Sequence, residues 1–237
     1  NTDNMSISGE TIDYGPCAFM DQYHPKTVFS SIDQFGRYAY SNQPLIIKWN
    51  LARFAECIIP LIDKNETSAV KIATDTINNF EKIYENKWLN MMRGKIGLFG
   101  EDKNDKKLII ALLNWMEKNK ADYTNTFCYL MNIETSNSRD YNKKEFRNWS
   151  NEWKRRLNFN NVSKTSYLNL MRDSNPLVIP RNFKVEEALK AANENDIKLF
   201  DKLLKILKNP YAIQKNISGY QSQAPITEKK YQTYCGT

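Results

Sequence analysis

The sequence predicts a mainly α-helical protein. Apolar residues recur at intervals of three and four over most of the 237 residues, which is the spacing of one face of an α-helix. Asn, Ser, Thr or Asp stands where many of these patterns begin, and Gly or Pro stands where many of them end. Alternation of apolar and polar residues, which is typical of strands, is found in a short run at the start of the chain.

The first 15 residues are the segment for which strands are predicted. Met5 to Ser8 and Thr11 to Ile12 alternate on either side of Gly9-Glu10. Alternation around a Gly-containing pair favours a tight β-hairpin. A hairpin at this position would bring Asn4 and Asp13, which flank it, close together.

Residues 16–42 are expected to form a long irregular loop, because they contain two prolines, Gly36 and several Ser and Asp residues with little periodicity. Loops of this length are often functional. A helix is predicted to follow from Pro44 to about Leu61, with Pro60 marking its end. Trp49 lies off the apolar stripe of this helix and is expected to pack against the loop.

Seven further helical patterns follow the first helix. They cover residues 65 or 67 to about 94, 105 to beyond 115, 121 to about 133, 146–157, 163 to about 173, 185–193 and 196–207. Between the third and fourth of these patterns, residues 134–141 are polar and are the candidate boundary between subdomains. Phe146, Trp149, Trp153 and Leu157 share one helix face and are expected to lie in the core.

Composition and charge exclude several classes of protein. The chain has 41% hydrophobic and 26% charged residues, as globular proteins do, and its longest apolar stretch is too short to cross a membrane. It begins without a signal segment. The net charge is +7, and the densest basic cluster is Lys154-Arg155-Arg156. We interpret this cluster as the solvated face of a helix, so neither nucleic acid nor a membrane is expected as a partner.

The four cysteines are Cys17, Cys57, Cys128 and Cys235, and no two of them form a CxxC pair. A structural zinc site is therefore not predicted. Cys57 and Cys128 lie within apolar helical patterns and are expected to be buried thiols. His24 is the single histidine, and no nucleophile elbow accompanies it.

Asn4 and Asp13 supply an amide oxygen and a carboxylate, which are ligands that Mg²⁺ or Mn²⁺ accepts. Asp3 is a second carboxylate beside this pair, free to act as a base. An Asp-Asn pair, a short connection and then Asp13-Tyr14-Gly15 follow the order of the kinase catalytic loop and its metal-binding Asp-Phe-Gly. The kinase spacing of four residues between Asp and Asn is missing here, which argues against ordinary kinase chemistry. The same residue types are also common in turns that bind no metal.

Six stretches, taken together, resemble the selenoprotein O family of kinase-like proteins, which are found in bacteria and in mitochondria. They are NTDNMSISGETIDYGPCAFMD at residues 1–21, GRYAYSNQP with WNLARFAE at 36–44 and 49–56, MRGKIGL at 92–98, NPLVIPRN at 175–182 and the ending YCGT at 234–237. These stretches keep their order from the first residue to the last, so the resemblance is more specific than Asp-Tyr-Gly alone.

The resemblance implies a fold and a division of the chain. Residues 1–237 would be the helical C-terminal lobe of a protein-kinase-like fold, with a short β-hairpin at the N-terminus and extra C-terminal helices. Residues 1–15 would form the catalytic and metal-binding hairpin, and residues 16–42 would occupy the activation-loop position. The motifs of the nucleotide-binding N-terminal lobe are not found in these residues, and the chain does not begin with Met. We therefore expect a fragment of a longer protein.

The resemblance also implies an activity. The full-length protein would be an adenylyltransferase that uses ATP and Mg²⁺ or Mn²⁺ to transfer AMP to Ser, Thr or Tyr hydroxyls of other proteins. Asn4 and Asp13 would bind the metal, Asp13 would also approach the ATP phosphates, and Asp3 would accept the proton. A conventional kinase and a non-enzymatic helical scaffold are the alternatives. The isolated fragment is expected to be inactive, and the protein is expected in the bacterial cytoplasm.

Members of the family are thought to form a disulfide between a C-terminal cysteine and a cysteine downstream of the Asp-aromatic-Gly motif. Cys235 matches the C-terminal cysteine, but Phe29 occupies the position aligned with its partner. Cys17 is the candidate substitute. A bridge between Cys17 and Cys235 requires their Cα atoms to lie within about 7 Å.

Overall fold

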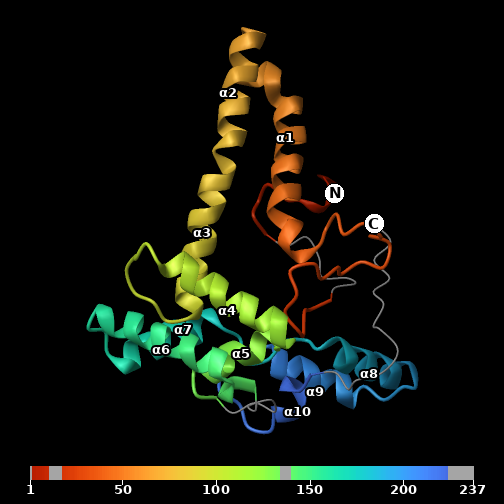
Figure 1. Ribbon diagram of the computed structural model, residues 1–237. Helices are drawn as coiled ribbons and strands as arrows, with labels where there is room; N and C mark the ends of the chain where they lie inside the picture. The colour runs from red at the N-terminus through yellow and green to blue at the C-terminus, as the bar shows by residue number, and fades with distance from the viewer. Residues whose placement is uncertain (1, 11–17, 134–139, 224–237) are drawn as a thin grey trace. The chain divides into compact units, whose positions relative to one another are not determined.

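A computed structural model of the protein describes residues 2–10, 18–133 and 140–223 (Figure 1). These residues are mainly helical, as predicted. Within these three ranges the β-structure is limited to an isolated antiparallel bridge between Gln22 and Asp122. The kinase-like character of the fold and the N-terminal hairpin remain predictions.

Ten α-helices lie within the described ranges, together with three short 3-10 helices. The α-helices are α1 (Gln43–Ile62), α2 (Glu66–Asn78), α3 (Phe80–Lys95), α4 (Asp105–Asn119), α5 (Tyr123–Leu130), α6 (Lys144–Phe159), α7 (Lys164–Ser174), α8 (Asn182–Asn193), α9 (Lys198–Leu207) and α10 (Ser218–Gln221). The 3-10 helices are Thr2–Asn4, Tyr40–Asn42 and Asp140–Asn142.

The described residues divide into two compact units. The first unit contains residues 2–10 and 25–88, and the second contains residues 18–24, 89–133 and 140–223. The boundary between residues 88 and 89 falls within α3. The predicted boundary at residues 134–141 is largely outside the described ranges and remains a prediction.

In the first unit, α1 and α2 lie side by side (Figure 1). Pro44 stands in the first turn of α1. Backbone N–H groups in the first turn make no hydrogen bond within the helix, so the lack of an N–H in proline costs nothing there. The predicted end at about Leu61, marked by Pro60, is confirmed to within one residue, because α1 ends at Ile62. The helix ends because Asp63 is extended, and the Asp63 carboxylate then accepts hydrogen bonds from Asn65 N and Ser68 Oγ at 2.9 and 2.8 Å.

One helix was predicted for residues 65–94, but the structure has two helices there, α2 and α3. The prediction is wrong at Asn79, where the first helix ends. Asn79 follows α2, and its N–H lies 3.2 Å from the carbonyl oxygens of Asp75 and Thr76. Asn78 and Asn79 stand in succession here, and asparagine side chains compete for backbone hydrogen bonds and weaken a helix. The predicted end near Gly94 is close, because α3 ends at Lys95.

The core of the second unit lies between α4 and α6. Phe146, Trp149, Trp153 and Leu157 are all buried, which confirms the predicted core stripe. The indole rings of Trp149 and Trp153 stack with centroids 5.7 Å apart. Trp149 Nε1 donates to Leu108 O of α4 at 2.9 Å, and Trp153 Nε1 donates to Ile96 O at 2.7 Å. Both indoles therefore bury their rings with the polar N–H satisfied.

The chain leaves α3 through a close turn at Gly97. Its φ is +73°, a conformation that glycine adopts without strain. A Cβ at this position would lie 3.0 Å from Met171 Sδ and 3.1 Å from Tyr167 O. Ile96 and Leu98 on either side are buried. Gly97 therefore serves packing at the end of α3.

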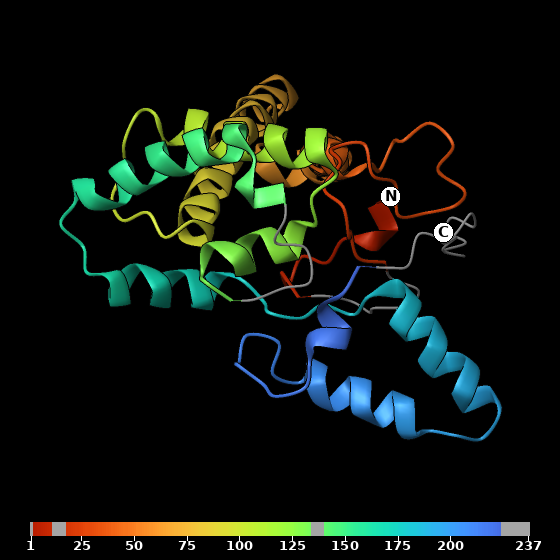
Figure 2. The same ribbon diagram turned by 60° about the horizontal axis from the view of Figure 1, so that its bottom comes forward.

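Figure 2 shows α8 and α9 side by side in the second unit. α9 buries Leu203 and Ile206, whereas Phe200 and Leu204 are exposed. Within the described part of the chain, no helix combines the length and the apolar content needed to cross a membrane.

Candidate functional site

The N-terminal segment that carries the predicted base and one predicted metal ligand is a single 3-10 turn, Thr2–Asn4, which includes Asp3. Asn4 is exposed, so its amide is accessible to a ligand. The next residue attaches the segment to the first unit, since Met5 Sδ accepts a hydrogen bond from Asn50 Nδ2 of α1 at 3.0 Å. Asn50 is buried in α1.

A turn follows where the hairpin was predicted. Gly9 has a φ of +75°, and its N–H lies 3.4 Å from Ser6 O. Ser6 Oγ and Ser8 Oγ are 2.6 Å apart and share a hydrogen bond. The run Met5 to Ser8 is not a strand, and Thr11 to Ile12 lie outside the described residues. The turn is therefore present, whereas the hairpin is not confirmed.

The other predicted site residues, Asp13, Cys17 and Cys235, also lie outside the described residues. The metal pair formed by Asn4 and Asp13 and the disulfide formed by Cys17 and Cys235 therefore remain predictions. Among the residues that the structure describes, no group of three or more His, Cys, Asp or Glu side chains is arranged to hold a metal.

The two remaining cysteines differ from each other. Cys128 in α5 is buried, as predicted, and burial, with a contribution from Asp122, raises the pKa of its thiol to about 12. Cys57 in α1 is exposed, so its predicted burial is wrong. Cys57 is adjacent to Ile58, which is half-buried, so the apolar stripe of α1 passes beside the thiol and leaves it exposed.

Residues 18–24, which follow the Asp-Tyr-Gly motif, are fixed within the second unit. Tyr23 N donates to Ala121 O at 2.9 Å, and Tyr123 N donates to Asp21 O at 2.8 Å, which forms the isolated bridge. Asn182, the first residue of α8, contacts both sides of Phe19: its Oδ1 accepts from Phe19 N and its Nδ2 donates to Phe19 O, each at 3.2 Å. This part of the long loop is therefore anchored by backbone hydrogen bonds.

Arg181 completes this anchor. Its side chain is 1% exposed and donates to Asp21 Oδ1 at 2.6 Å, to both Asp122 oxygens at 2.7 and 3.2 Å and to Gln221 O at 3.0 Å. Burial raises the pKa of the Asp122 carboxyl, and the hydrogen bonds from Arg181 oppose that rise. An arginine at this position could contact a phosphate or have a structural role. Its guanidinium holds two carboxylates, which supports the structural role.

The second half of the loop, in the first unit, is also fixed. The Asp33 carboxylate accepts the N–H groups of Arg37 and Tyr38, each at 2.8 Å. Asn42 Nδ2 donates to Gly36 O at 2.7 Å. The guanidinium of Arg37 lies 4.9 Å from the ring centre of Trp49, a cation–π distance. The predicted packing of Trp49 against the loop is thereby confirmed.

Lys95 is a buried amine in the second unit with a shifted pKa. Its side chain is near the rings of Phe127 and Tyr123, with Nζ 4.3 and 5.4 Å from their centres, and Nζ lies 3.5 Å from Ser174 O. Burial lowers the pKa of Lys95 from 10.5 to about 8. Amines with such a pKa can act as nucleophiles, but this one is enclosed, so we interpret it as a structural group.

Replacing Lys95 by Met should raise the free energy of unfolding at pH 7 by about 1–2 kcal/mol. In the folded state Lys95 binds its proton more weakly than in the unfolded state, so the native protein gains stability as the pH rises from about 8 to 10.5. Urea unfolding at several pH values measures this difference. The advantage of Lys95→Met should shrink towards pH 10, whereas the exposed Lys103→Met variant should follow the wild type. An advantage independent of pH would contradict the assignment.

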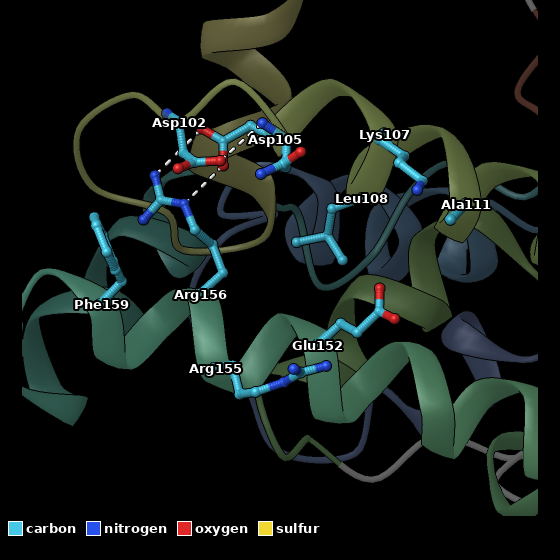
Figure 3. A pocket seen from close by; sticks show the side chains of 10 residues that line it. Asp102, Asp105, Lys107, Leu108, Ala111, Glu152, Arg155, Arg156 and Phe159 are labelled. Carbon is cyan, nitrogen blue, oxygen red and sulfur yellow. Dashed lines mark hydrogen bonds and ion pairs between the residues drawn. The ribbon is translucent and has the colours of Figure 1, made fainter.

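A cavity of about 390 Å³ is lined by residues of α4 and α6 and by the segment that precedes α4, and Figure 3 shows the side chains that line it. At its edge, the buried Asp105 carboxylate accepts from Arg93 Nε and Arg156 Nε, each at 2.7 Å, and from Asp102 N at 2.9 Å. Burial favours a higher pKa for Asp105, but the hydrogen bonds from Arg156, Asp102 N and Arg93 outweigh it, and the pKa lies below its ordinary value.

The ion pair between Asp105 and Arg156 corrects the prediction that Lys154-Arg155-Arg156 form a solvated helix face. Lys154 and Arg155 are exposed, but Arg156 is paired with Asp105 and also donates to Phe99 O at 3.1 Å. None of the ten residues that line the cavity has a buried polar side-chain atom without a partner, so we assign it no ligand. The sequence carries no signal for this ion-pair cluster, because it does not show which charges meet.

Comparison with known proteins gives results that agree with one another. A family model described as protein adenylyltransferase SelO matches residues 1–208. Three relatives bear the name protein nucleotidyltransferase YdiU. They come from Pelagibacter ubique (61% identity, 49% of the relative covered), Clostridium botulinum strain 657 (52% identity, 48% covered) and Nitrosococcus oceani (48% identity, 48% covered), and each match includes the whole of this chain. The chain spans about half the length of the curated relatives it matches.

Proposed function

Because the chain belongs to the SelO family of protein adenylyltransferases, we propose that the full-length protein transfers AMP from ATP to Ser, Thr or Tyr hydroxyls of other proteins. The observation that carries the proposal is the family match over residues 1–208, which includes Asp3, Asn4 and Asp13-Tyr14-Gly15 in the expected order. The names of the relatives also describe transfer of a nucleotide to protein.

In the proposed reaction, the acceptor hydroxyl oxygen forms a bond to the α-phosphorus of ATP. Asp3 accepts the hydroxyl proton, the bond from the α-phosphorus to the oxygen that bridges to the β-phosphate breaks, and pyrophosphate leaves. Asp3 would act as a general base.

Asn4 and Asp13 would hold Mg²⁺ or Mn²⁺, and their amide and carboxylate oxygens suit either ion. The exposure of Asn4 is compatible with this role. A divalent cation bound there supplies positive charge that offsets the charge on the phosphates. Asp13 would also orient the nucleotide phosphates.

The test of this proposal uses full-length protein incubated in parallel with ATP labelled at the α-phosphate and ATP labelled at the γ-phosphate. Protein-bound label should appear only with the α-labelled nucleotide. Label from the γ-phosphate alone would show phosphoryl transfer and contradict the proposal. Calorimetry of ATP binding by residues 1–237 alone tests the companion proposal that this part has no useful affinity for ATP; micromolar binding would overturn it.

A further inference from the structure

The loop that precedes α1 presents apolar side chains to solvent in a fixed conformation. Phe35 is 97% exposed and Ile32 is 60% exposed. The hydrogen bonds of the Asp33 carboxylate to Arg37 N and Tyr38 N fix the backbone around them. In a loop held in this way, the exposure of the aromatic ring is imposed by the structure. Exposed aromatic side chains on a rigid backbone are typical contacts for a partner molecule.

A cation lies two residues beyond Phe35. The guanidinium of Arg37 lies 4.9 Å from the ring centre of Trp49 and 5.8 Å from that of Tyr38. Across residues 2–10, 18–133 and 140–223, no carboxylate lies within 4.0 Å of this guanidinium. An arginine that stacks on rings keeps its N–H edge available for a carboxylate.

Two cations of α1 near Trp49 are paired with carboxylates. Lys48 Nζ lies 2.7 Å from Glu81 Oε1, and Arg53 Nη2 lies 2.5 Å from Glu56 Oε1. Trp49 is covered by Arg53 as well as by Arg37, with the Arg53 guanidinium 5.3 Å from the ring centre. A nucleic acid is therefore a poor fit, since it needs a row of free cations and open ring faces for stacking. One free guanidinium beside an exposed aromatic ring fits a carboxylate and an apolar side chain.

We propose that the loop around Phe35 and Arg37 binds an acidic segment of the protein that is modified, with Arg37 contacting a carboxylate and Phe35 contacting an apolar side chain. This inference rests on the proposed function for the identity of its partner. The contacts themselves come from residues in the first unit.

Binding of a probe peptide tests the proposal without any reaction. The probe is a fluorescein-labelled peptide of about twelve residues with a central Tyr flanked by Glu and Leu, and a second peptide carries Lys in place of Glu. Fluorescence anisotropy with full-length protein should show at least about tenfold tighter binding of the acidic peptide. Arg37→Gln and Phe35→Ser should each weaken that binding about 5- to 10-fold, and Arg37→Lys should have an intermediate effect because it keeps the charge but loses the planar group.

The matched control is Leu61→Ser, which removes another apolar side chain of the first unit that is 85% exposed. This variant should bind the acidic peptide as the wild type does. Equal binding of the two peptides, or Arg37→Gln and Phe35→Ser variants within about twofold of the wild type, would overturn the proposal. Tighter binding of a 20-nucleotide single-stranded DNA than of the acidic peptide would overturn it in favour of a nucleic-acid surface.

A second readout separates this proposal from the proposed function. If the wild type transfers AMP to an acidic acceptor such as casein, Phe35→Ser should raise the KM for the acceptor about 5- to 10-fold and leave the KM for ATP unchanged. Transfer with an unchanged KM for the acceptor would overturn the docking surface and leave the enzymatic proposal intact. Selective peptide binding by a protein that transfers no AMP would do the reverse.

Discussion

Replacing Asp13 by Asn in the full-length protein is expected to lower the rate of AMP transfer by about 10²–10³-fold. The substitution keeps the size of the side chain but removes the negative charge proposed to bind the divalent cation and to orient the ATP phosphates. A carboxylate binds Mg²⁺ or Mn²⁺ more strongly than a neutral amide does. Transfer of α-labelled AMP to protein, measured over a range of Mn²⁺ concentrations, should show both a lower rate and a higher Mn²⁺ requirement.

Two further variants show whether the loss belongs to metal binding. Asp3→Asn should lower kcat by about 10²–10⁴-fold, as expected for a general base, without changing the Mn²⁺ requirement. Asp75→Asn alters an exposed carboxylate of α2 and should leave both quantities unchanged. Activity of Asp13→Asn within a few-fold of the wild type would remove Asp13 from the proposed site.

Replacing Asp105 by Asn is expected to reduce the free energy of unfolding of the 237-residue chain by about 3–5 kcal/mol. The Asp105 side chain is fully buried and is shared by Arg93 and Arg156, whose side chains are 9% and 10% exposed. An amide would leave Arg93 with Asn90 Oδ1 and the exposed Glu101 carboxylate, and would leave Arg156 with the Phe99 and Gly100 carbonyl oxygens, so neither guanidinium would keep a buried carboxylate. Urea unfolding followed by tryptophan fluorescence reports this loss, because Trp115, Trp149 and Trp153 are buried in the same unit.

Glu152→Gln is the matched control, since Glu152 lines the same cavity but is exposed (Figure 3). It should change the free energy of unfolding by less than about 0.5 kcal/mol. The pKa of Asp105 is lowered in the folded state, so its contribution is complete above the ordinary value of 3.8 and is lost as the pH falls through the lower folded pKa. The free energies of unfolding of the wild type and of Asp105→Asn should therefore become equal at acidic pH. A cost for Asp105→Asn no larger than that of Glu152→Gln would show that the cluster adds nothing.

The helices could be predicted because their apolar spacing is local information. The stripe of Phe146, Trp149, Trp153 and Leu157 predicted both a helix and its buried face, and both are confirmed. The errors arise where a local pattern does not decide the outcome. The single helix predicted for residues 65–94 is divided at Asn79, where asparagine side chains compete for backbone hydrogen bonds.

Much of the candidate site could be proposed from motif residues alone. The ion pairs and hydrogen bonds that hold the neighbouring loop in place could not. Arg181 meets Asp21 and Asp122 across 160 and 59 residues of sequence. Such meetings depend on how helices and loops pack, and a single sequence carries no signal of them. The same holds for Arg37 and Trp49, although the expectation that Trp49 packs against the loop came close to this contact.

The contact of Asn182 with Phe19 involves only main-chain atoms of Phe19. These two hydrogen bonds therefore do not depend on which side chain stands at position 19. Substitutions at this position should leave both of them in place. Proline is the exception, because an imide nitrogen offers no hydrogen to the amide oxygen of Asn182. In related sequences that retain an asparagine at position 182, we expect many different amino acids at position 19, but not proline.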